Sequence, residues 1–477
     1  MDPERYDLAV IGSGPAGQKA SIAAAKLGKK VAVVDRPGQL GGVSLQSGTI
    51  PSKTLREGIL YFTGFRQRSF YGRHHQLKEE ISVGDLAFRV QTVRTRQGEV
   101  VRDQLRRNRV HLIEGSAKFT DPHTLQVEGS GGVSRIAADF VLIACGSRPA
   151  HHPKVPVDGR RILDSDQLGG LETLPRELIV VGAGVIGLEY ASMAAALGVK
   201  VTIIEQRPAM LEFADREIVE TLTYWMRDIG ATFRLGETVT GVEVTDGHVL
   251  AQLESGKHVR GDVLLYCVGR QSNADRLNLE AAGLSADARG RIAVDDCFRT
   301  SVPHIYAAGD VIGFPALAAT SMEQGRLASR HMFSGRAIQR PAAFPYGIYT
   351  IPEISMVGRT EEELTRSKIP YEVGRARYEE IAKAQMLGAD NGLLKILFHP
   401  KTLEILGVHV IGDGASEIIH IGQTALALGG SLEYFCDAVF NFPTLAESYR
   451  VAALDGLNRL GSPPAETPSS AAAGEAS

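Results

Sequence analysis

Residues 6–17 read Tyr-Asp-Leu-Ala-Val-Ile-Gly-Ser-Gly-Pro-Ala-Gly, and this stretch decides the fold. The apolar run before Gly12 predicts a buried strand, and the alanine-rich segment after Gly17 predicts a helix. The glycines between them suit a tight turn, the close approach of a pyrophosphate and close helix–strand packing, while the helix N-terminus receives the negative charge. Asp35 ends the next apolar run, where a carboxylate can accept hydrogen bonds from ribose hydroxyls.

The same plan returns at residues 178–187, which read Leu-Ile-Val-Val-Gly-Ala-Gly-Val-Ile-Gly. A helical stretch follows to Leu197, and Glu205 ends the next strand-like run. One such pattern is a weak signal, but two complete strand–turn–helix–strand–acid units predict two dinucleotide sites. From Phe344 onward the pattern changes to alternating strands, such as Leu393 to Phe398 and Ile405 to Ile411, and then helices. The expected fold class is therefore α/β, with two Rossmann-like dinucleotide-binding domains and a C-terminal α+β domain.

Composition indicates a large enzyme with several hydrophobic cores. The chain has 477 residues, 44% of them hydrophobic, with a net charge of −3 and a pI near 6.5. This balance favours neither nucleic acid nor an anionic membrane as a partner. No apolar run approaches the roughly 18 residues of a membrane span, and the N-terminus has no charged-then-apolar leader. We therefore expect a cytoplasmic protein.

Four cysteines are scattered along the chain, without the paired spacing of a disulfide framework or a metal site. Such usage fits a reducing compartment. Cys145 and Cys267 each end an apolar strand-like run, so both are interpreted as small buried hydrophobic residues rather than reactive thiols. A metal site built from Glu417 and His420, one helical turn apart, is disfavoured, and no metal is expected.

Six blocks resemble, in order, the class I flavoprotein pyridine nucleotide-disulphide oxidoreductases, the family of the flavoprotein disulfide reductases. The blocks are residues 12–17, 41–53, 144–149, 182–189, 306–310 and 442–447. The resemblance spans nearly the whole chain, from residue 5 to 460. It implies FAD on the first unit, NAD(H) and NADP(H) as exchanging substrates on the second, and a C-terminal dimerisation domain that forms a homodimer or a higher homo-oligomer.

This resemblance sets the expected domain boundaries. The domains are an FAD-binding domain in two parts, 1–152 and 271–340, an NAD(P)-binding domain at 153–270, and a dimerisation domain at 341–461. Residues 462–477 are rich in Pro, Ser, Ala and Glu and have little to bury, so they are predicted to be a disordered tail. A single strand is expected from Val110 to Phe119, and Pro51 is expected to begin a helix.

The resemblance also implies site residues. Lys53 and Glu189 are expected to pair beside the flavin N5 as catalytic residues, with Asp35 on the adenosine ribose and Asp310 near the ribityl chain. The implied FAD contacts are Gly12, Gly14, Pro15, Ala16, Gly17, Asp35, Arg36, Gly41, Gly42, Val43, Ser44, Gly48, Thr49, Lys53, Ala117, Ala144, Gly146, Asp310, Leu317 and Ala318. The implied nucleotide contacts are Gly182, Gly184, Ile186, Gly187, Glu189, Glu205, Gln206, Arg207 and Gly269.

Two departures from the family pattern narrow the function. The reductases carry a Gly-Gly-x-Cys-x-x-x-x-Cys loop, but here the two cysteine positions are Ser44 and Thr49, whose hydroxyls cannot form a redox disulfide. Where the reductases have a histidine before Pro-Thr as general acid, this chain has Phe442, whose ring carries no proton to transfer. Glu447, whose counterpart orients that histidine in the reductases, is still present. It is either left over from that pair or an ordinary helix-terminal or solvated carboxylate. The dithiol machinery is therefore missing.

What remains predicts FAD-dependent hydride transfer between NADPH and NAD+ without a redox disulfide. A nicotinamide held at roughly 3–3.5 Å from the flavin can donate its hydride, and a second nucleotide can accept it in the same pocket. This is a ping-pong exchange. Residues 48–56, 347–353 and 447–454 resemble the transhydrogenase branch of the family, which implies an Si-specific NAD(P)+ transhydrogenase activity.

Other interpretations stay open at this point. The chain could be an NADH-dependent diaphorase or quinone reductase of the same fold, or a non-catalytic flavin-binding scaffold or sensor. Lys53 could be a helix charge without a partner, and Glu189 an amphipathic helix position. Glu205 favours NAD over NADP because it repels a 2′-phosphate, whereas Arg207, two residues on, can pair with that phosphate.

Overall fold

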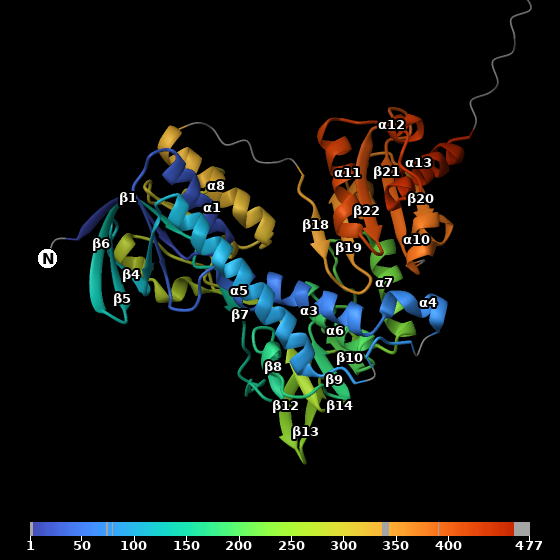
Figure 1. Ribbon diagram of the computed structural model, residues 1–477, viewed down its shortest axis with the longest axis horizontal. Coiled ribbons are helices and arrows are strands. Elements are labelled where there is room, and N and C mark those ends of the chain that lie inside the picture. The colour runs from blue at the N-terminus through green and yellow to red at the C-terminus, as the bar shows by residue number, and fades with distance from the viewer. Residues whose placement is uncertain (1–2, 73–74, 79, 336–342, 390, 462–477) are drawn as a thin grey trace, which may run out of the picture. The chain divides into compact units, whose positions relative to one another are not determined.

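The computed structural model describes residues 3–72, 75–78, 80–335, 343–389 and 391–461. Contacts divide them into two compact units (Figure 1). Unit 1 holds the described residues within 1–65, 74–211 and 226–341, and unit 2 holds those within 66–73, 212–225 and 342–477. The predicted disordered tail lies outside the described residues, and the predicted domain boundaries stay predictions.

The first sheet of unit 1 has seven strands in the order β3-β2-β1-β6-β5-β4, with β17 also paired to β6. β1, β2, β3, β6 and β17 pair in parallel, whereas β4, β5 and β6 form an antiparallel meander. The strands are β1 (Glu4–Ile11), β2 (Val31–Asp35), β3 (His111–Glu114), β4 (Ser116–Asp121), β5 (Thr124–Gly129), β6 (Gly132–Ile143) and β17 (Ile305–Ala307). The chain leaves β1 toward β2 on one side and returns as β6 on the other, which makes the carboxyl end of β1 a topological switch point.

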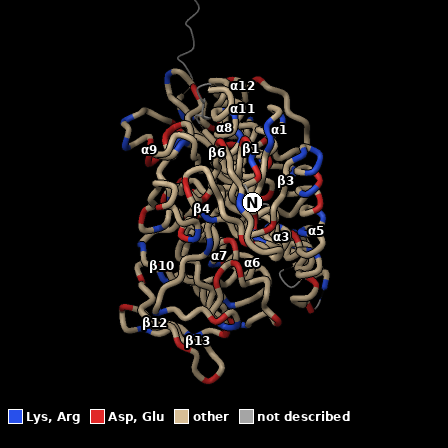
Figure 2. Tube along the Cα trace, turned by 90° about the vertical axis from the view of Figure 1, so that its left-hand side faces the viewer, with Lys and Arg blue, Asp and Glu red and all other residues tan. Residues whose placement is uncertain are grey.

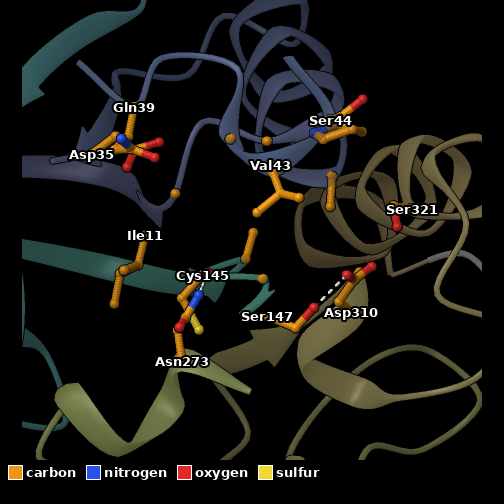
Figure 3. A pocket seen from close by; sticks show the side chains of 18 of the residues that line it. Ile11, Asp35, Gln39, Val43, Ser44, Cys145, Ser147, Asn273, Asp310 and Ser321 are labelled. Atoms are coloured by element: carbon orange, nitrogen blue, oxygen red, sulfur yellow. Dashed lines mark hydrogen bonds between the residues drawn. The ribbon is translucent and has the colours of Figure 1, made fainter. Parts of the chain in front are cut away.

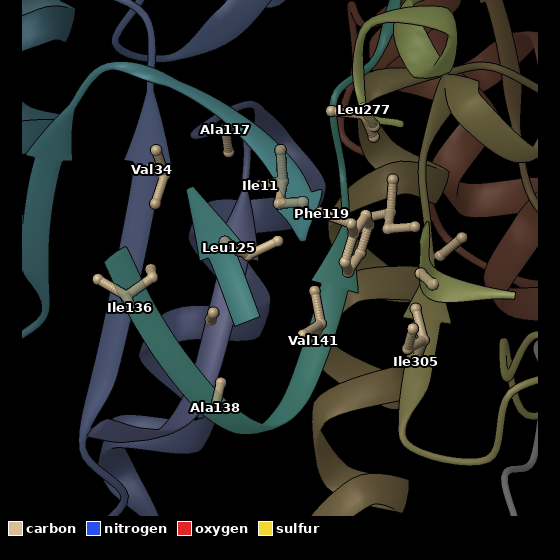
Figure 4. Close-up of a cluster of buried hydrophobic side chains, with 14 of the residues drawn as sticks. Ile11, Val34, Ala117, Phe119, Leu125, Ile136, Ala138, Val141, Leu277 and Ile305 are labelled. Atoms are coloured by element: carbon tan, nitrogen blue, oxygen red, sulfur yellow. The ribbon is translucent and has the colours of Figure 1, made fainter. Parts of the chain in front are cut away.

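Both faces of this sheet are buried. Along β1, Ala9 and Ile11 join one core cluster and Leu8 and Val10 join another, because successive side chains of a strand point to opposite faces. Phe119 lies at the centre of the first cluster (Figure 4). The helices of this region are α1 (Pro15–Lys26), α2 (Gly42–Gln46), α3 (Thr49–Phe62), α5 (Val83–Arg107) and α8 (Ala318–Ser334), whereas α4 (Arg68–Tyr71) belongs to unit 2. Of these, α1 and α8 lie side by side (Figure 1).

A second sheet in unit 1 repeats the parallel plan, in the order β11-β10-β9-β15-β8. Its strands are β8 (Ile162–Asp164), β9 (Glu177–Val181), β10 (Lys200–Glu205), β11 (Thr232–Leu235) and β15 (Val263–Tyr266), with the helix α6 (Val185–Ala196). The helix between β10 and β11, α7 (Arg216–Asp228), belongs to unit 2 as far as Trp225. Two small sheets complete the unit: β12 (Val239–Thr245), β13 (His248–Leu253) and β14 (His258–Gly261), and the pair β7 (Ser147–Pro149) and β16 (Arg270–Ser272). Both predicted nucleotide-type units are thus built on parallel sheets.

Unit 2 contains a five-stranded antiparallel sheet in the order β18-β19-β22-β21-β20. Its strands are β18 (Tyr346–Ile348), β19 (Ile354–Gly358), β20 (Glu372–Arg377), β21 (Leu393–Phe398) and β22 (Ile405–Ile411). Its helices are α9 (Glu361–Arg366), α10 (Ala382–Leu387), α11 (Ala415–Ala427), α12 (Leu432–Asp437) and α13 (Ser448–Arg459). The chain's short 3-10 turns are η1 (Phe65–Gln67), η2 (Leu168–Gly170), η3 (Asn273–Arg276), η4 (Leu279–Ala282), η5 (Asp310–Ile312), η6 (Tyr378–Glu380) and η7 (Leu445–Glu447). The predicted α+β character of the C-terminal region is confirmed.

Two local predictions were wrong. The expected strand from Val110 to Phe119 is broken at Gly115, whose amide bonds to Asp35 O at 2.8 Å, so that β3 and β4 occupy opposite ends of the sheet. The helix carrying Lys53 begins at Thr49 rather than at Pro51. Proline is tolerated there because the amides of the first turn have no intrahelical partner in any case.

Charges of both signs are interspersed along the trace (Figure 2). No helix within the described ranges is long and apolar enough to cross a bilayer.

A buried ion cluster lies in the interior of unit 2. Lys395, on β21, is 1% exposed and contacts Asp215 at 2.9 Å, Glu217 at 2.9 Å and also Glu361. Arg375 forms a two-pronged bond to the same Glu217 at 2.8 and 3.0 Å. The three carboxylates are the one group of metal-capable side chains found among the described residues, and the Lys395 ammonium lies among them.

Replacing Lys395 with methionine should destabilise unit 2 by about 3–5 kcal/mol, because it leaves the buried Asp215 carboxylate without its cation. The chain's single tryptophan, Trp225, lies in unit 2, so its fluorescence during urea unfolding reports on this unit. Lys401→Met, at an exposed position, is the matched control. Equal unfolding midpoints for the two variants would show that the cluster contributes nothing to stability.

Candidate functional site

The first glycine turn is shaped by close backbone contacts. A Cβ on Gly12 would lie 2.3 Å from Ala144 O, and a Cβ on Gly17 would lie 1.9 Å from Gly12 O, so neither position accepts a side chain. A Cβ on Gly14 would meet nothing within 4 Å. Gly14 is also the N-cap of α1, and no side chain caps it. The first amides of α1 therefore face open space, as an anion-binding site requires. The turn Gly12–Gly17 and these amides form the first cradle.

The second turn has the same geometry. A Cβ on Gly182 would lie 2.7 Å from Cys267 O, and one on Gly187 would lie 2.0 Å from Gly182 O. Gly184 again has nothing within 4 Å and caps α6 without a side-chain bond. In both turns the first and third glycines are crowded by backbone atoms, and the middle glycine is open, as the predicted roles require. The turn Gly182–Gly187 and the first amides of α6 form the second cradle, which has the same local geometry as the first.

Asp35 lies at the end of β2, beside the first cradle. Its carboxylate accepts hydrogen bonds from Ser13 N at 2.7 Å, from Ser13 Oγ at 2.5 Å and from Arg36 N at 2.8 Å. Burial raises the pKa of Asp35 above its ordinary value, although the bonds from Ser13 and Arg36 oppose that shift. Ser13 Oγ also accepts from Gly41 N at 2.9 Å, which connects the second glycine-rich segment to the cradle.

One elongated cavity joins Asp35 to Asp310 (Figure 3). Asp35 and Gln39 lie at one side, Val43 and Ser44 line another wall, and Ser147 Oγ donates to Asp310 Oδ2 at 2.6 Å (Figure 3). The predicted FAD residues that line the cavity are Gly12, Gly14, Pro15, Ala16, Asp35, Arg36, Gly42, Val43, Ser44, Thr49, Ala117, Ala144, Gly146, Asp310 and Ala318. Residues from six separate parts of the chain therefore meet at one site.

Five predicted residues do not line this cavity: Gly17, Gly41, Gly48, Lys53 and Leu317. Sequence reasoning missed other lining residues, including Gln39, Cys145, Ser147, Asn273 and Ser321. Asn273, which donates to Cys145 O at 3.0 Å, comes from the 3-10 turn η3, which no motif marks. Ser147 and Cys145 could have been found, because they lie within the predicted block 144–149.

Lys53 and Glu189 form an ion pair. Lys53 Nζ lies 2.6 Å from Glu189 Oε2, although the two residues are far apart in sequence. Lys53 comes from the first turns of α3 and Glu189 from α6, so the pair joins the helices of the two glycine-turn regions. The side chain of Glu189 is 5% exposed and that of Lys53 is 26% exposed. The pair is therefore sheltered on the carboxylate side and accessible on the ammonium side.

The thiols are not suited to redox chemistry. Burial raises the pKa of both Cys145 and Cys267 to about 12, which keeps the sulfurs protonated. All four cysteines are free, and none is fully buried, so the prediction that Cys145 and Cys267 are buried was wrong in extent. Ser44 and Thr49 occupy the positions of the missing redox pair, and both line the cavity. Hydroxyls thus take the place of a disulfide at this wall.

Glu205 and Arg207 form a fork beside the second cradle. Arg207 Nε and Nη2 donate to the Glu205 carboxylate at 3.0 and 3.2 Å, and Arg207 N donates at 3.0 Å. Ala183 N, within the glycine turn, donates to the same carboxylate at 2.8 Å. Burial opposes ionisation of Glu205, but the bonds from Arg207 and Ala183 prevail and lower its pKa. Gln206 between them is exposed, and Gly269 adopts φ 85°.

In unit 2, Phe442 and Glu447 occupy the positions of the family's histidine–glutamate pair. The Phe442 ring is exposed. Glu447 Oε2 is buried and has no hydrogen-bond partner among the residues that the structure describes. His420 bonds to Gln423 at 2.7 Å.

Three features together define the class of protein. They are two open cradles with their acidic residues, one cavity that extends from the first cradle, and a lysine–glutamate pair that joins the two glycine-turn regions. These features define an oxidoreductase that handles two dinucleotides. Comparison with known proteins identifies the family. The model for "Pyridine nucleotide-disulphide oxidoreductase" matches residues 6–325, and the model for its dimerisation domain matches residues 344–453. The chain belongs to the pyridine nucleotide-disulphide oxidoreductases.

Curated relatives cover nearly the whole chain. The soluble pyridine nucleotide transhydrogenase of Mycobacterium tuberculosis (strain H37Ra) is 53% identical over 457 residues, which are 95% of this chain and 98% of the relative. The protein of the same name from Enterobacter sp. (strain 638) is 44% identical over 460 residues, again 95% of this chain and 98% of the relative.

Solved structures share the fold. LpdA from Mycobacterium tuberculosis has a TM-score of 0.86 at 28% identity, covering 94% of this chain and 99% of that one. The HOCl-induced flavoprotein disulfide reductase RclA from Escherichia coli has a TM-score of 0.84 at 27% identity, with the same coverage. The predicted family, fold class and enzyme class are confirmed, and the dimerisation domain indicates a homo-oligomer.

Proposed function

We propose that this chain transfers hydride between NADPH and NAD+ through bound FAD, without a redox disulfide. The observation that carries the proposal is an intact Lys53–Glu189 pair in a site where Ser44 and Thr49 stand in place of both cysteines. Without the dithiol, electrons have no route to a disulfide substrate, whereas both nucleotide cradles keep their form. The name of the curated relatives agrees with this activity.

FAD fits the first cradle. Open space at Gly14 admits its pyrophosphate, Asp35 stands where a ribose would bind, and the cavity continues to Asp310. When bound, FAD supplies a two-electron carrier that accepts a hydride from NADPH and returns one to NAD+. The cradle at Gly182–Gly187 receives both nucleotides in turn, because the chain offers one such site beside α6 for each FAD. This alternation makes the exchange ping-pong.

Lys53 supplies positive charge to the flavin ring. A preorganised ammonium stabilises negative charge that develops on the ring as hydride arrives. Glu189, nearly fully buried, fixes the position of that ammonium through the 2.6 Å contact. The carboxylate of Glu189 also bounds the space in which a nicotinamide would lie against Lys53.

Anaerobic mixing of the purified yellow protein with NADPH, followed by thio-NAD+, tests the proposal. We expect the flavin absorbance to bleach and then to recover as one equivalent of reduced thio-NAD+ forms. Reduction by NADH alone, with rapid turnover of quinones or dyes, would support an NADH-dependent diaphorase. A flavin that neither nucleotide bleaches would support a non-catalytic scaffold. Either result would overturn transhydrogenation.

Acceptance of both nucleotides depends on the Glu205–Arg207 fork. Arg207→Ala should raise the KM for NADPH by about tenfold or more, because a charged hydrogen bond to the 2′-phosphate is worth about 1.5–3 kcal/mol. It also leaves Glu205 without its fork partner, which increases repulsion of the phosphate. The KM for NADH should change little. Lys200→Ala, at the exposed start of the same strand, is the control, and an unaltered KM for NADPH would refute the role of Arg207.

Unit 2 supplies the surface for a homodimer. Large apolar side chains are exposed on it, including Leu428, Tyr434, Val439 and Phe442. An unpartnered buried carboxylate oxygen is costly, so Glu447 is expected to find its partner in the dimer. Sedimentation equilibrium on the wild type should give twice the chain mass. The cytoplasm, which holds both nucleotide pools, is the proposed location.

A further inference from the structure

A second large cavity in unit 1 lies apart from the cavity at the first cradle. It is enclosed by α3, α5, α6 and the segment 165–178, and its volume is about 400 Å³. The two cavities have no lining residue in common. A volume of this size is within the range of small-molecule sites. The cavity can therefore hold a ligand of its own.

The walls of this cavity are mainly apolar. Aliphatic side chains from all its elements face it, namely Leu55, Ile59, Leu86, Leu168, Met193 and Leu197. Tyr190 also lines it and is 7% exposed, and no described residue forms a hydrogen bond with its hydroxyl. The hydroxyl is not among the fully enclosed polar atoms that lack a partner, so it can be reached from the cavity. Burial and the nearby charge of Glu189 raise the pKa of Tyr190, so the hydroxyl keeps its proton and can donate it.

Two ionisable groups on the walls do not call for a charged ligand. Burial raises the pKa of Asp166, which disfavours its charged form. Arg94 is already bonded to Gln91 on the same helix. A charged ligand would lose its water against walls that are mainly aliphatic, which is unfavourable. An uncharged molecule avoids that loss.

The cavity is also separate from the nucleotide cradle. Tyr190, Met193, Ala194 and Leu197 lie about 8 to 18 Å along the axis of α6 from Val185, at 1.5 Å per residue. The cradle opens at the N-terminus of that helix. None of the residues Gly182–Gly187 lines the cavity, and neither Lys53 nor Glu189 does, so a nucleotide bound by its pyrophosphate at Gly184 does not account for the apolar walls around Tyr190.

We propose that this cavity binds a small, uncharged, mainly apolar molecule whose carbonyl oxygen accepts a hydrogen bond from Tyr190. The walls remove its apolar part from water, and the Tyr190 hydroxyl gains the partner that the described residues do not provide. The occupant contacts both α3 and α6, the two helices that carry Lys53 and Glu189. The site is thus placed to act on the catalytic pair without entering the flavin cavity.

Benzophenone, an uncharged two-ring ketone that is inert in the dark, tests the proposal on the FAD-loaded full chain. Calorimetric titration should show saturable binding with one site per chain. Ala194→Phe, which fills the cavity, should weaken binding at least tenfold, and Tyr190→Phe should weaken it about two- to tenfold, as expected for one hydrogen bond. Val100→Phe, on the exposed side of α5, should bind as the wild type does.

Photolabelling of the wild type gives a second measurement that needs no variant to fold. Near-ultraviolet light inserts bound benzophenone into adjacent C–H bonds, and peptide mass spectrometry locates the adduct. We expect labels within residues 165–174 and 190–197. Absence of saturable binding, equal binding by a folded Ala194→Phe variant, or labels confined to other segments would each overturn the proposal.

Discussion

Replacing Lys53 with methionine should slow reduction of the bound flavin by NADPH about 100- to 1,000-fold, the usual effect of removing one preorganised group that stabilises developing charge. The variant keeps the length of the side chain but loses the charge. It also leaves Glu189, 5% exposed, without the ammonium 2.6 Å away. Stopped-flow absorbance under anaerobic conditions measures the rate, and the flavin content of the purified variant should match the wild type, because the open cradle at Gly14 and the Asp35 carboxylate are unchanged.

Matched variants separate the charge of Lys53 from its position. Lys53→Arg keeps the charge and should retain part of the rate, whereas Lys26→Met, at an exposed lysine in the last turn of α1, should retain all of it. Glu189→Gln should slow reduction less than Lys53→Met does, since it misplaces the ammonium without removing it. A wild-type rate for Lys53→Met would mean that Lys53 is an ordinary helix charge, and the proposed mechanism would fail.

Much of the nucleotide-binding framework follows from local rules. Glycines at 12, 14 and 17 were predicted to have three different roles, and the structure distinguishes Gly14, where a Cβ meets nothing, from its two crowded neighbours. Strands β21 and β22 occupy the ranges expected from their apolar runs. These features depend on contacts between residues close in sequence, or on backbone geometry that only glycine allows. A single sequence carries such information directly.

Other features depend on tertiary contacts that no local pattern encodes. In the sequence, Lys395 is a charged residue within an apolar strand, and nothing near it indicates a partner. The fold brings Asp215 and Glu361 into contact with it. Asn273 joins the first cavity from the 3-10 turn η3, which carries no motif. Tyr190 follows Glu189 directly, so its sequence context suggests only a helix position, and the cavity it lines requires packing of three helices. Long-range packing therefore decides what sequence reasoning missed.

Valine at Gly14 should give a folded protein that lacks FAD, and valine at Gly184 should give one that keeps FAD but no longer reacts with NADPH. Both glycines have extended backbone angles that any residue adopts, φ −63° at Gly14 and φ −79° at Gly184. Their side-chain directions are open, so valine meets no protein atom within 4 Å of its Cβ. Its methyl groups instead occupy the space that a pyrophosphate needs.

The pair of variants assigns each cradle to its ligand. We expect Gly14→Val to be colourless with a native far-ultraviolet circular dichroism spectrum, and Gly184→Val to be yellow, to bleach with dithionite, and to resist NADPH at concentrations 100-fold above the wild-type KM. Gly17→Val and Gly187→Val are the contrast, because their Cβ atoms would lie 1.9 and 2.0 Å from backbone oxygens and should prevent folding of the unit. Full flavin content in Gly14→Val, or normal reduction of Gly184→Val by NADPH, would contradict the assignment of that cradle. Since the two turns are built alike, opposite phenotypes at equivalent glycines can come only from the ligands that they hold.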